Sequence, residues 1–139
     1  MSIEENKKIV RRYQEIYNSN NLDDLLEVVS EELLTPKMMP GVPHGIEGAK
    51  AAHQVMLAGF PDYQAVIEEL IAEGDKVAAR ITMSGTNMGS FMGIPPTGKF
   101  ISFTGIYIAR IANGKIVEHW GEEDGVSLLA QLGALPPLS

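Results

Sequence analysis

The sequence predicts an α+β fold in which N-terminal helices pack on the concave face of a curved antiparallel sheet. Two observations support this prediction: helical patterns of apolar residues occupy the first 60 residues, and strand-like segments joined by tight turns dominate the rest. The chain of 139 residues has no repeat, linker or low-complexity tract, so we expect a single domain over residues 1–139. A curved sheet of this kind can enclose a pocket between itself and the helices.

The first part of the chain predicts three helices. In residues 2–20 apolar side chains recur at helical spacing, and Ser2 begins a capping-box pattern. Leucines mark a short second helix in residues 22–29, and residues 49–60 are expected to form a third, which Pro61 ends. The three prolines and three glycines of residues 35–48 indicate irregular chain, or a short strand followed by a loop.

The second part of the chain predicts four strands and a closing helix. The expected strands are residues 66–72, 77–83, 99–112 and 115–121. Asn113 and Gly114 are a strong hairpin signal, because both central residues of a type I′ turn have positive φ. Leu128 and Leu132 indicate a short closing helix, which Gly133 is placed to end.

The strand expected over residues 99–112 is apolar on both faces. One face carries residues typical of a core: Ile101, Phe103, Tyr107 and Ile111. The other face carries Ile106 and Ile108 and would meet water in a single copy of the chain. We therefore expect a homodimer in which a second copy covers the outer face of the sheet.

Composition and charge argue against several classes of function. The net charge is −7, from 18 acidic and 11 basic residues, which leaves little of the counterion release that drives nucleic-acid binding. Cysteine is absent, which excludes disulfides and thiolate nucleophiles. The charged start lacks the apolar run of a signal peptide, and no stretch approaches the roughly 18 apolar residues of a membrane helix. We expect a cytoplasmic protein that binds neither nucleic acid nor membrane.

The sequence predicts neither a metal nor an organic cofactor. The three histidines, His44, His53 and His119, do not stand at the spacing of ligand pairs. Residues 45–48 lack the glycine spacing and preceding strand of a dinucleotide site, and residues 97–99 precede a strand rather than the helix of a phosphate loop. We therefore expect a reaction that needs no cofactor.

Asp124, between the last expected strand and the closing helix, allows two interpretations. Aspartate is a favoured N-cap, typically worth about 1 kcal/mol to a helix, and backbone N–H groups that bond to it weaken it as a base. In an apolar pocket the pKa would instead rise toward the working pH and suit acid/base catalysis. Position alone favours the cap, and both interpretations remain open.

Aromatic and methionine side chains provide a candidate wall for such a pocket. The candidates for contact with a small hydrophobic or aromatic substrate are Tyr13, Tyr17, Met56, Met83, Phe103, Tyr107 and Trp120. Each of them is also an ordinary core residue. His119 is a second titratable candidate, and on a regular strand it points opposite to Trp120, so at most one of that pair faces the pocket.

A series of short motifs runs through most of the chain. They are Phe-Pro-Asp at residues 60–62, Gly-Thr-Asn-Met-Gly-Ser-Phe at 85–91, Pro-Pro-Thr-Gly-Lys at 95–99, Gly-Lys-Ile at 114–116, Trp120 four residues before Asp124, and Gln-Leu-Gly at 131–133. Each motif is weak alone, but together and in this order they are specific. The chain resembles the SnoaL-like polyketide cyclases.

This resemblance implies a fold, a reaction and a catalytic residue. The fold is the cone-shaped nuclear transport factor 2-like (cystatin-like) one, usually dimeric. In the characterised cyclases an intramolecular aldol condensation closes the last ring of an aromatic polyketide ester without metal or cofactor. By resemblance, Asp124 takes a proton from the carbon between two carbonyl groups and returns one to the aldol oxygen. Family members often carry His where this chain has Asn87, which can bond to a substrate but cannot shuttle protons near pH 7.

Two other functions remain open at this point. One is an isomerase or hydratase that acts on a small hydrophobic substrate through the same carboxylate. The other is a non-catalytic module that binds a hydrophobic ligand, in which Asp124 is only a helix cap. A raised pKa of Asp124 would favour the enzymes, and a lowered one would favour the cap.

Overall fold

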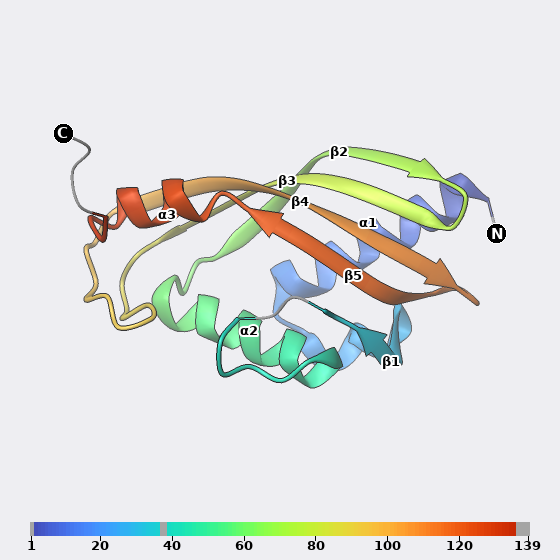
Figure 1. Cartoon of the computed structure of the whole chain (residues 1–139), viewed down its shortest axis with the longest axis horizontal. Helices are drawn as coiled ribbons and strands as arrows, with labels where there is room; N and C mark the ends of the chain where they lie inside the picture. The colour runs from blue at the N-terminus through green and yellow to red at the C-terminus, as the bar shows by residue number, and fades with distance from the viewer. Residues whose placement is uncertain (1, 37–38, 136–139) are drawn as a thin grey trace.

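The computed structural model describes residues 2–36 and 39–135, and in this part of the chain a curved five-stranded sheet wraps around two helices (Figure 1). Across the sheet the strands are ordered β1 (Val29–Leu34), β5 (Lys115–Glu123), β4 (Phe100–Ala112), β3 (Lys76–Thr86) and β2 (Gln64–Glu73). Neighbouring strands from β2 to β5 pair antiparallel, and β1 pairs parallel with β5. The α+β prediction is confirmed.

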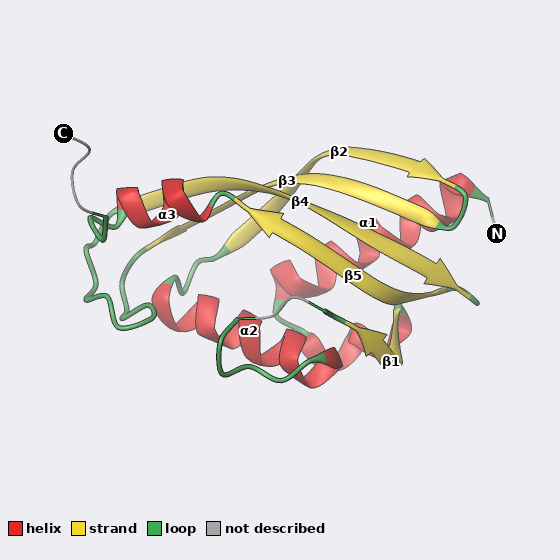
Figure 2. Ribbon diagram, in the orientation of Figure 1, coloured by secondary structure: helices red, strands yellow, loops and turns green. Residues whose placement is uncertain are grey.

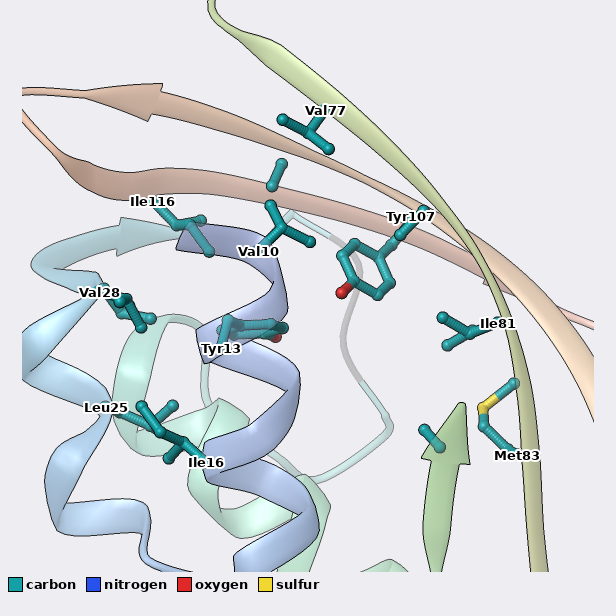
Figure 3. Close-up of a cluster of buried hydrophobic side chains, with 14 of the residues drawn as sticks. Val10, Tyr13, Ile16, Leu25, Val28, Val77, Ile81, Met83, Tyr107 and Ile116 are labelled. Carbon is teal, nitrogen blue, oxygen red and sulfur yellow. The ribbon is translucent and has the colours of Figure 1, made fainter. Parts of the chain in front are cut away.

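Helices α1 (Ile3–Ser19) and α2 (Gly45–Gly59) lie together on the concave side of the sheet, and α3 (Gly125–Gln131) follows β5 at one end (Figure 2). The side chain of Ser2 accepts a bond from the Glu5 N–H at 3.1 Å, so the predicted cap starts α1. Val10, Tyr13 and Ile16 of α1 are buried against the sheet (Figure 3). None of the helices in the described residues is long and apolar enough to span a membrane.

Strand β1 was not expected, and the prediction of a helix over residues 22–29 was wrong for its last two residues. The chain forms a 3₁₀ helix only over Leu22–Glu27. Val28 and Val29 are buried, and the Ile116 N–H donates to the Val28 carbonyl at 2.7 Å. Pairing with β5 buries these β-branched residues, and this tertiary contact overrides the local helical pattern.

Strand β4 alternates strictly between the two faces of the sheet. Its concave face carries the four predicted core residues, and all of them are buried. On its outer face, Ile106 is 52% exposed and Ile108 is 41% exposed in the single chain. The hairpin to β5 turns at Asn113 (φ 52°) and Gly114 (φ 77°), as predicted.

Candidate active site

All four tyrosines of the chain gather with two histidines on the concave side of the sheet. This aromatic cluster comprises Tyr13 and Tyr17 of α1, His53 of α2, Tyr63 just before β2, Tyr107 of β4 and His119 of β5. Neighbouring ring centroids are 4.7 to 5.9 Å apart, from His53 through Tyr17 and Tyr13 to Tyr107 and His119. Figure 3 shows Tyr107 reaching from the sheet toward Tyr13 on the helix. The cluster joins both helices to the sheet.

Burial keeps the phenols of the aromatic cluster protonated. It raises the pKa of Tyr17 to about 12, and it raises the pKa values of Tyr13, Tyr63 and Tyr107 above their usual range as well. The Tyr107 hydroxyl lies 3.5 Å from the Oε1 atom of buried Gln14, to which it donates. Near neutral pH these side chains are therefore uncharged hydroxyl groups in an apolar interior.

The two histidines of the cluster are held neutral by the same burial. It lowers the pKa of His119 to about 4 and also lowers the pKa of His53. The Nε2 atom of His53 lies 2.8 Å from Asn20 Oδ1, which only accepts, so Nε2 carries the proton. At neutral pH neither imidazole is a cation, and each offers one donor and one acceptor.

The structure brings several of the predicted binding residues together. Tyr13, Tyr17, Tyr107 and His119 belong to the aromatic cluster, and Met83 and Phe103 are buried on the same face of the sheet. Met56 on α2 is partly buried against the core.

Sequence reasoning missed His53 and Tyr63. His53 stands three residues before Met56 on the same helix, and helical spacing places the two on one face. That spacing was a signal for His53. Nothing in the sequence separated Tyr63 from an ordinary loop residue.

Trp120 lies away from the cluster, on the outer face of the sheet. It is opposite Ile108 and 47% exposed, and its Nε1–H donates to Glu118 Oε1 at 3.2 Å. His119 points inward and Trp120 outward, as the alternation of a strand requires.

Asn87 is fully buried, and its amide bonds only to the protein. Its Nδ2 donates to the carbonyls of Gly59 at 3.2 Å and Gly89 at 3.0 Å. Its Oδ1 accepts from the N–H and the hydroxyl of Thr97, at 2.8 and 2.9 Å. Because every donor and acceptor of the amide is used, Asn87 ties the loop between β3 and β4 to the end of α2.

Asp124 is the N-cap of α3 in this structure. Its Oδ1 accepts from the Ser127 N–H at 3.0 Å, its own N–H donates to the Thr104 carbonyl at 2.9 Å, and the residue is exposed. It also borders a surface hollow of about 370 Å³, whose other lining residues are Arg80, Thr104, Gly105, Ile106, Glu122 and Glu123. The capping interpretation is therefore realised, beside a hollow large enough for part of a small molecule.

Glu123, the last residue of β5, stands on the concave side beside the cluster. It pairs with Gly105, whose strand neighbours Phe103 and Tyr107 are buried core residues. Part of the side chain is solvent-exposed, yet desolvation by the surrounding protein raises the pKa of Glu123. Its charge in turn contributes to the raised pKa of Tyr63. Glu123 and Asp124 are thus adjacent carboxylates in different environments, Glu123 beside the aromatic cluster and Asp124 at the cap of α3.

In the described ranges, no group of three or more His, Asp or Glu side chains is placed to hold a metal ion. The groups that the cluster offers are aromatic faces, neutral hydroxyls, neutral imidazoles and a carboxylate at its edge. Such groups can stack on a flat conjugated molecule and donate hydrogen bonds to its oxygens.

The chain is similar in sequence to known polyketide cyclases. The family model of the SnoaL-like polyketide cyclases matches residues 7–132. The chain is 33% identical over 129 residues to aklanonic acid methyl ester cyclase DnrD of Streptomyces peucetius, covering 90% of this chain and 88% of that protein. It is 32% identical over 123 residues to the nogalonic acid methyl ester cyclase of Streptomyces nogalater, covering 84% and 89%.

Solved structures show the same fold. TsrD from Streptomyces laurentii superposes with a TM-score of 0.87 at 32% identity, covering 97% of this chain and 99% of that one. IdmH from Streptomyces antibioticus superposes with a TM-score of 0.82 at 34% identity, covering 92% and 98%. The match of the family model over most of the chain, with relatives above 30% identity, shows that this protein belongs to the SnoaL-like polyketide cyclase family.

Proposed function

We propose that this protein closes a ring of an aromatic polyketide ester by an intramolecular aldol reaction that needs neither metal nor organic cofactor. The observation that carries the proposal is the aromatic cluster on the concave face. The similar cyclases named above act on aklanonic acid methyl ester and nogalonic acid methyl ester. These are esters of the class that such a cluster suits.

The aromatic cluster supports binding of a flat, oxygen-rich substrate. Its rings meet mostly edge to face, so a conjugated ring system that enters between them gains stacking surface. Its phenols are neutral donors for carbonyl and phenolic oxygens of the substrate. Held in one folded conformation, the reacting carbons of the substrate form a ring far faster than in a flexible chain.

The chemistry requires one base and one acid. The two carbonyl groups beside the reacting carbon spread the negative charge of the enolate, so a single positioned carboxylate suffices to remove the proton. The family resemblance assigns this role to Asp124, which follows Glu123 at the end of β5. Its Oδ1 also accepts from the Ser127 N–H at 3.0 Å.

The test is ring closure of aklanonic acid methyl ester by the wild type and by Asp124→Asn. Asparagine is also a favoured N-cap, so the substitution keeps α3 capped while it removes the base. We expect the wild type to form the cyclised product and the variant to be slower by about a hundredfold or more, with an unchanged melting temperature.

Two results would count against this proposal. Equal rates for the two proteins would leave Asp124 only its capping role. Absence of ring closure by the wild type would remove the polyketide assignment and favour an isomerase, a hydratase or a binding protein instead.

We also propose that two copies of the chain associate through the outer face of the sheet. One row of apolar residues crosses four strands of this face, and its members are Ile71, Ala78, Ile108 and Trp120. Three of them are large and 41 to 61% exposed in the single chain. A second copy that packs on this row would remove it from water.

A further inference from the structure

Glu123 is the carboxylate at the end of β5 that faces the concave side. The register with β4 shows this, because alternate residues of the two strands pair on each face. The pairs on the concave face are Gly105 with Glu123, Tyr107 with Gly121, and Ala109 with His119. Glu123 therefore shares a face with His119, whereas Glu122 and Trp120 stand on the outer face.

Neighbouring side chains cover the two glycines of this face. A Cβ atom on Gly121 would lie 3.4 Å from His119 Cε1. A Cβ atom on Gly105 would lie 3.3 Å from Glu123 Cγ and 2.9 Å from Met83 Cε, so these two side chains lie over Gly105. Gly121 separates His119 from Glu123 along β5. Four residues of strand span roughly 13 Å, so His119 and Glu123 stand about that far apart along β5.

We propose that Glu123 is a second catalytic carboxylate, which donates a proton to the oxygen formed at ring closure. This proposal rests on the proposed function and deepens it. Asp124 first takes the proton from the carbon between the two carbonyl groups. The enolate carbon then bonds to the ketone carbon, and the electron pair of the C=O π bond moves to oxygen. That oxygen takes the proton of the Glu123 carboxylic acid, and proton exchange with water restores both carboxyl groups.

The other groups of the concave face are poorer acids. His119, with a pKa of about 4, is neutral at neutral pH and is not the imidazolium acid. Burial raises the pKa values of Tyr63 and Tyr107, which makes them weaker acids. Glu123 differs, because desolvation by the surrounding protein raises its pKa and so favours its protonated form. Position and protonation together support the assignment.

The kinetic test compares Glu123→Gln with the wild type on aklanonic acid methyl ester. We expect the variant to lose about a hundredfold in kcat with little change in KM. The kcat of the wild type should also fall on the alkaline side as Glu123 loses its proton, and this limb should be absent from the variant. The matched control is Glu68→Gln, which removes the same charge from an exposed position of β2 and should keep both kcat and the pH profile.

A second measurement tests the position of Glu123 without turnover. Carboxyl carbon NMR of the slow Asp124→Asn protein gives the pKa of Glu123 directly. The Glu123 resonance is assigned as the one that disappears when Glu123→Gln is added to this variant. We expect a pKa above that of an exposed glutamate and a further change when aklanonic acid methyl ester binds.

The outcomes separate this proposal from the proposed function. A Glu123→Gln protein with the kcat and pH profile of the wild type overturns the role of Glu123 while cyclisation stands. The role of Glu123 is also overturned if its resonance titrates like that of an exposed glutamate and does not change when the ester binds. If the wild type does not cyclise the ester, the proposed function fails and this role of Glu123 fails with it.

Discussion

At the scale of single residues, the interior imidazole of His119 shows how the site combines burial with polarity. Its ring centroid lies 4.7 Å from that of Tyr107 and 5.8 Å from that of Tyr13. This packing lowers its pKa to about 4, against about 6.5 for an exposed histidine. A neutral imidazole can exchange hydrogen bonds with a ligand without placing a buried charge in the pocket.

The lowered pKa of His119 predicts a loss of stability in mild acid. In the unfolded chain this histidine binds a proton below about pH 6.5, whereas in the folded protein it does so only below about pH 4. The free energy of unfolding therefore falls as the pH drops through this window. Between pH 7 and pH 4.5 the loss from this group is roughly 2 to 3 kcal/mol. Urea unfolding of the wild type and of His119→Gln should show a smaller fall for the variant. Equal falls for the two proteins would mean that His119 titrates normally.

Alternation along the strand predicted that His119 and Trp120 point to opposite faces, but not which of the two faces inward. The structure places His119 inside and Trp120, a predicted substrate contact, outside, and the predicted core residues of β4 are buried. The hydrogen bonds of the Asn87 side chain could not be predicted, because its partner Gly59 lies 28 positions away in the sequence. The contacts of Tyr63 were missed for the same reason. Periodicity specifies faces, whereas such bonds depend on how loops meet in three dimensions.

At the scale of elements, the loop between β3 and β4 is docked on the end of α2. The N–H groups of Met88 and Gly89 both donate to the Gly59 carbonyl. A Cβ atom on Gly89 would lie 2.0 Å from the Ala58 carbonyl oxygen, so this close approach requires glycine. Asn87 completes the contact, and the loop is thereby held beside the helix that carries His53.

Removal of the Asn87 amide should loosen this docking. Asn87→Ala leaves the Gly89 carbonyl and the Thr97 N–H without their partner, and we expect a loss of about 3 kcal/mol in the free energy of unfolding. Asn21→Ala is the control, because Asn21 is exposed and makes no capping bond with its side chain. It should change stability by less than about 0.5 kcal/mol. A stable Asn87→Ala protein with only a higher KM would instead indicate that Asn87 contacts the substrate.

The helices and the four antiparallel strands were predictable as elements, whereas β1 was not. Four of its six residues are polar or exposed, and burial does not alternate along it. Its strand conformation comes from the parallel pairing with β5, and no local sequence pattern predicts that pairing.

At the scale of the whole molecule, the outer face of the sheet carries a row of charged residues beside a row of apolar residues. Lys76, Arg110 and Glu118 form a row across β3, β4 and β5, and Arg110 pairs with Glu118. The apolar row that includes Ile108 and Trp120 lies next to it. An interface centred on the apolar row would have polar residues at its rim, as stable interfaces do.

The proposed dimer predicts how surface substitutions change the mass in solution. Sedimentation velocity should show the wild type as a dimer and Ile108→Asp as a folded monomer, because the carboxylate would be buried unpaired in the interface. Val126→Asp, which changes a 70% exposed apolar residue on α3, should leave the dimer intact. A wild type that sediments as a monomer at micromolar concentration would contradict the proposed assembly.

The central claim is that this protein is an aldol cyclase of aromatic polyketide esters. The measurement that tests it most directly is chromatography of aklanonic acid methyl ester incubated with a small molar fraction of the wild-type protein. The account predicts many turnovers to the ring-closed product, far above the rate in buffer, and near-complete loss of this rate in Asp124→Asn. Recovery of the ester unchanged, although it binds to the folded protein, would contradict the account.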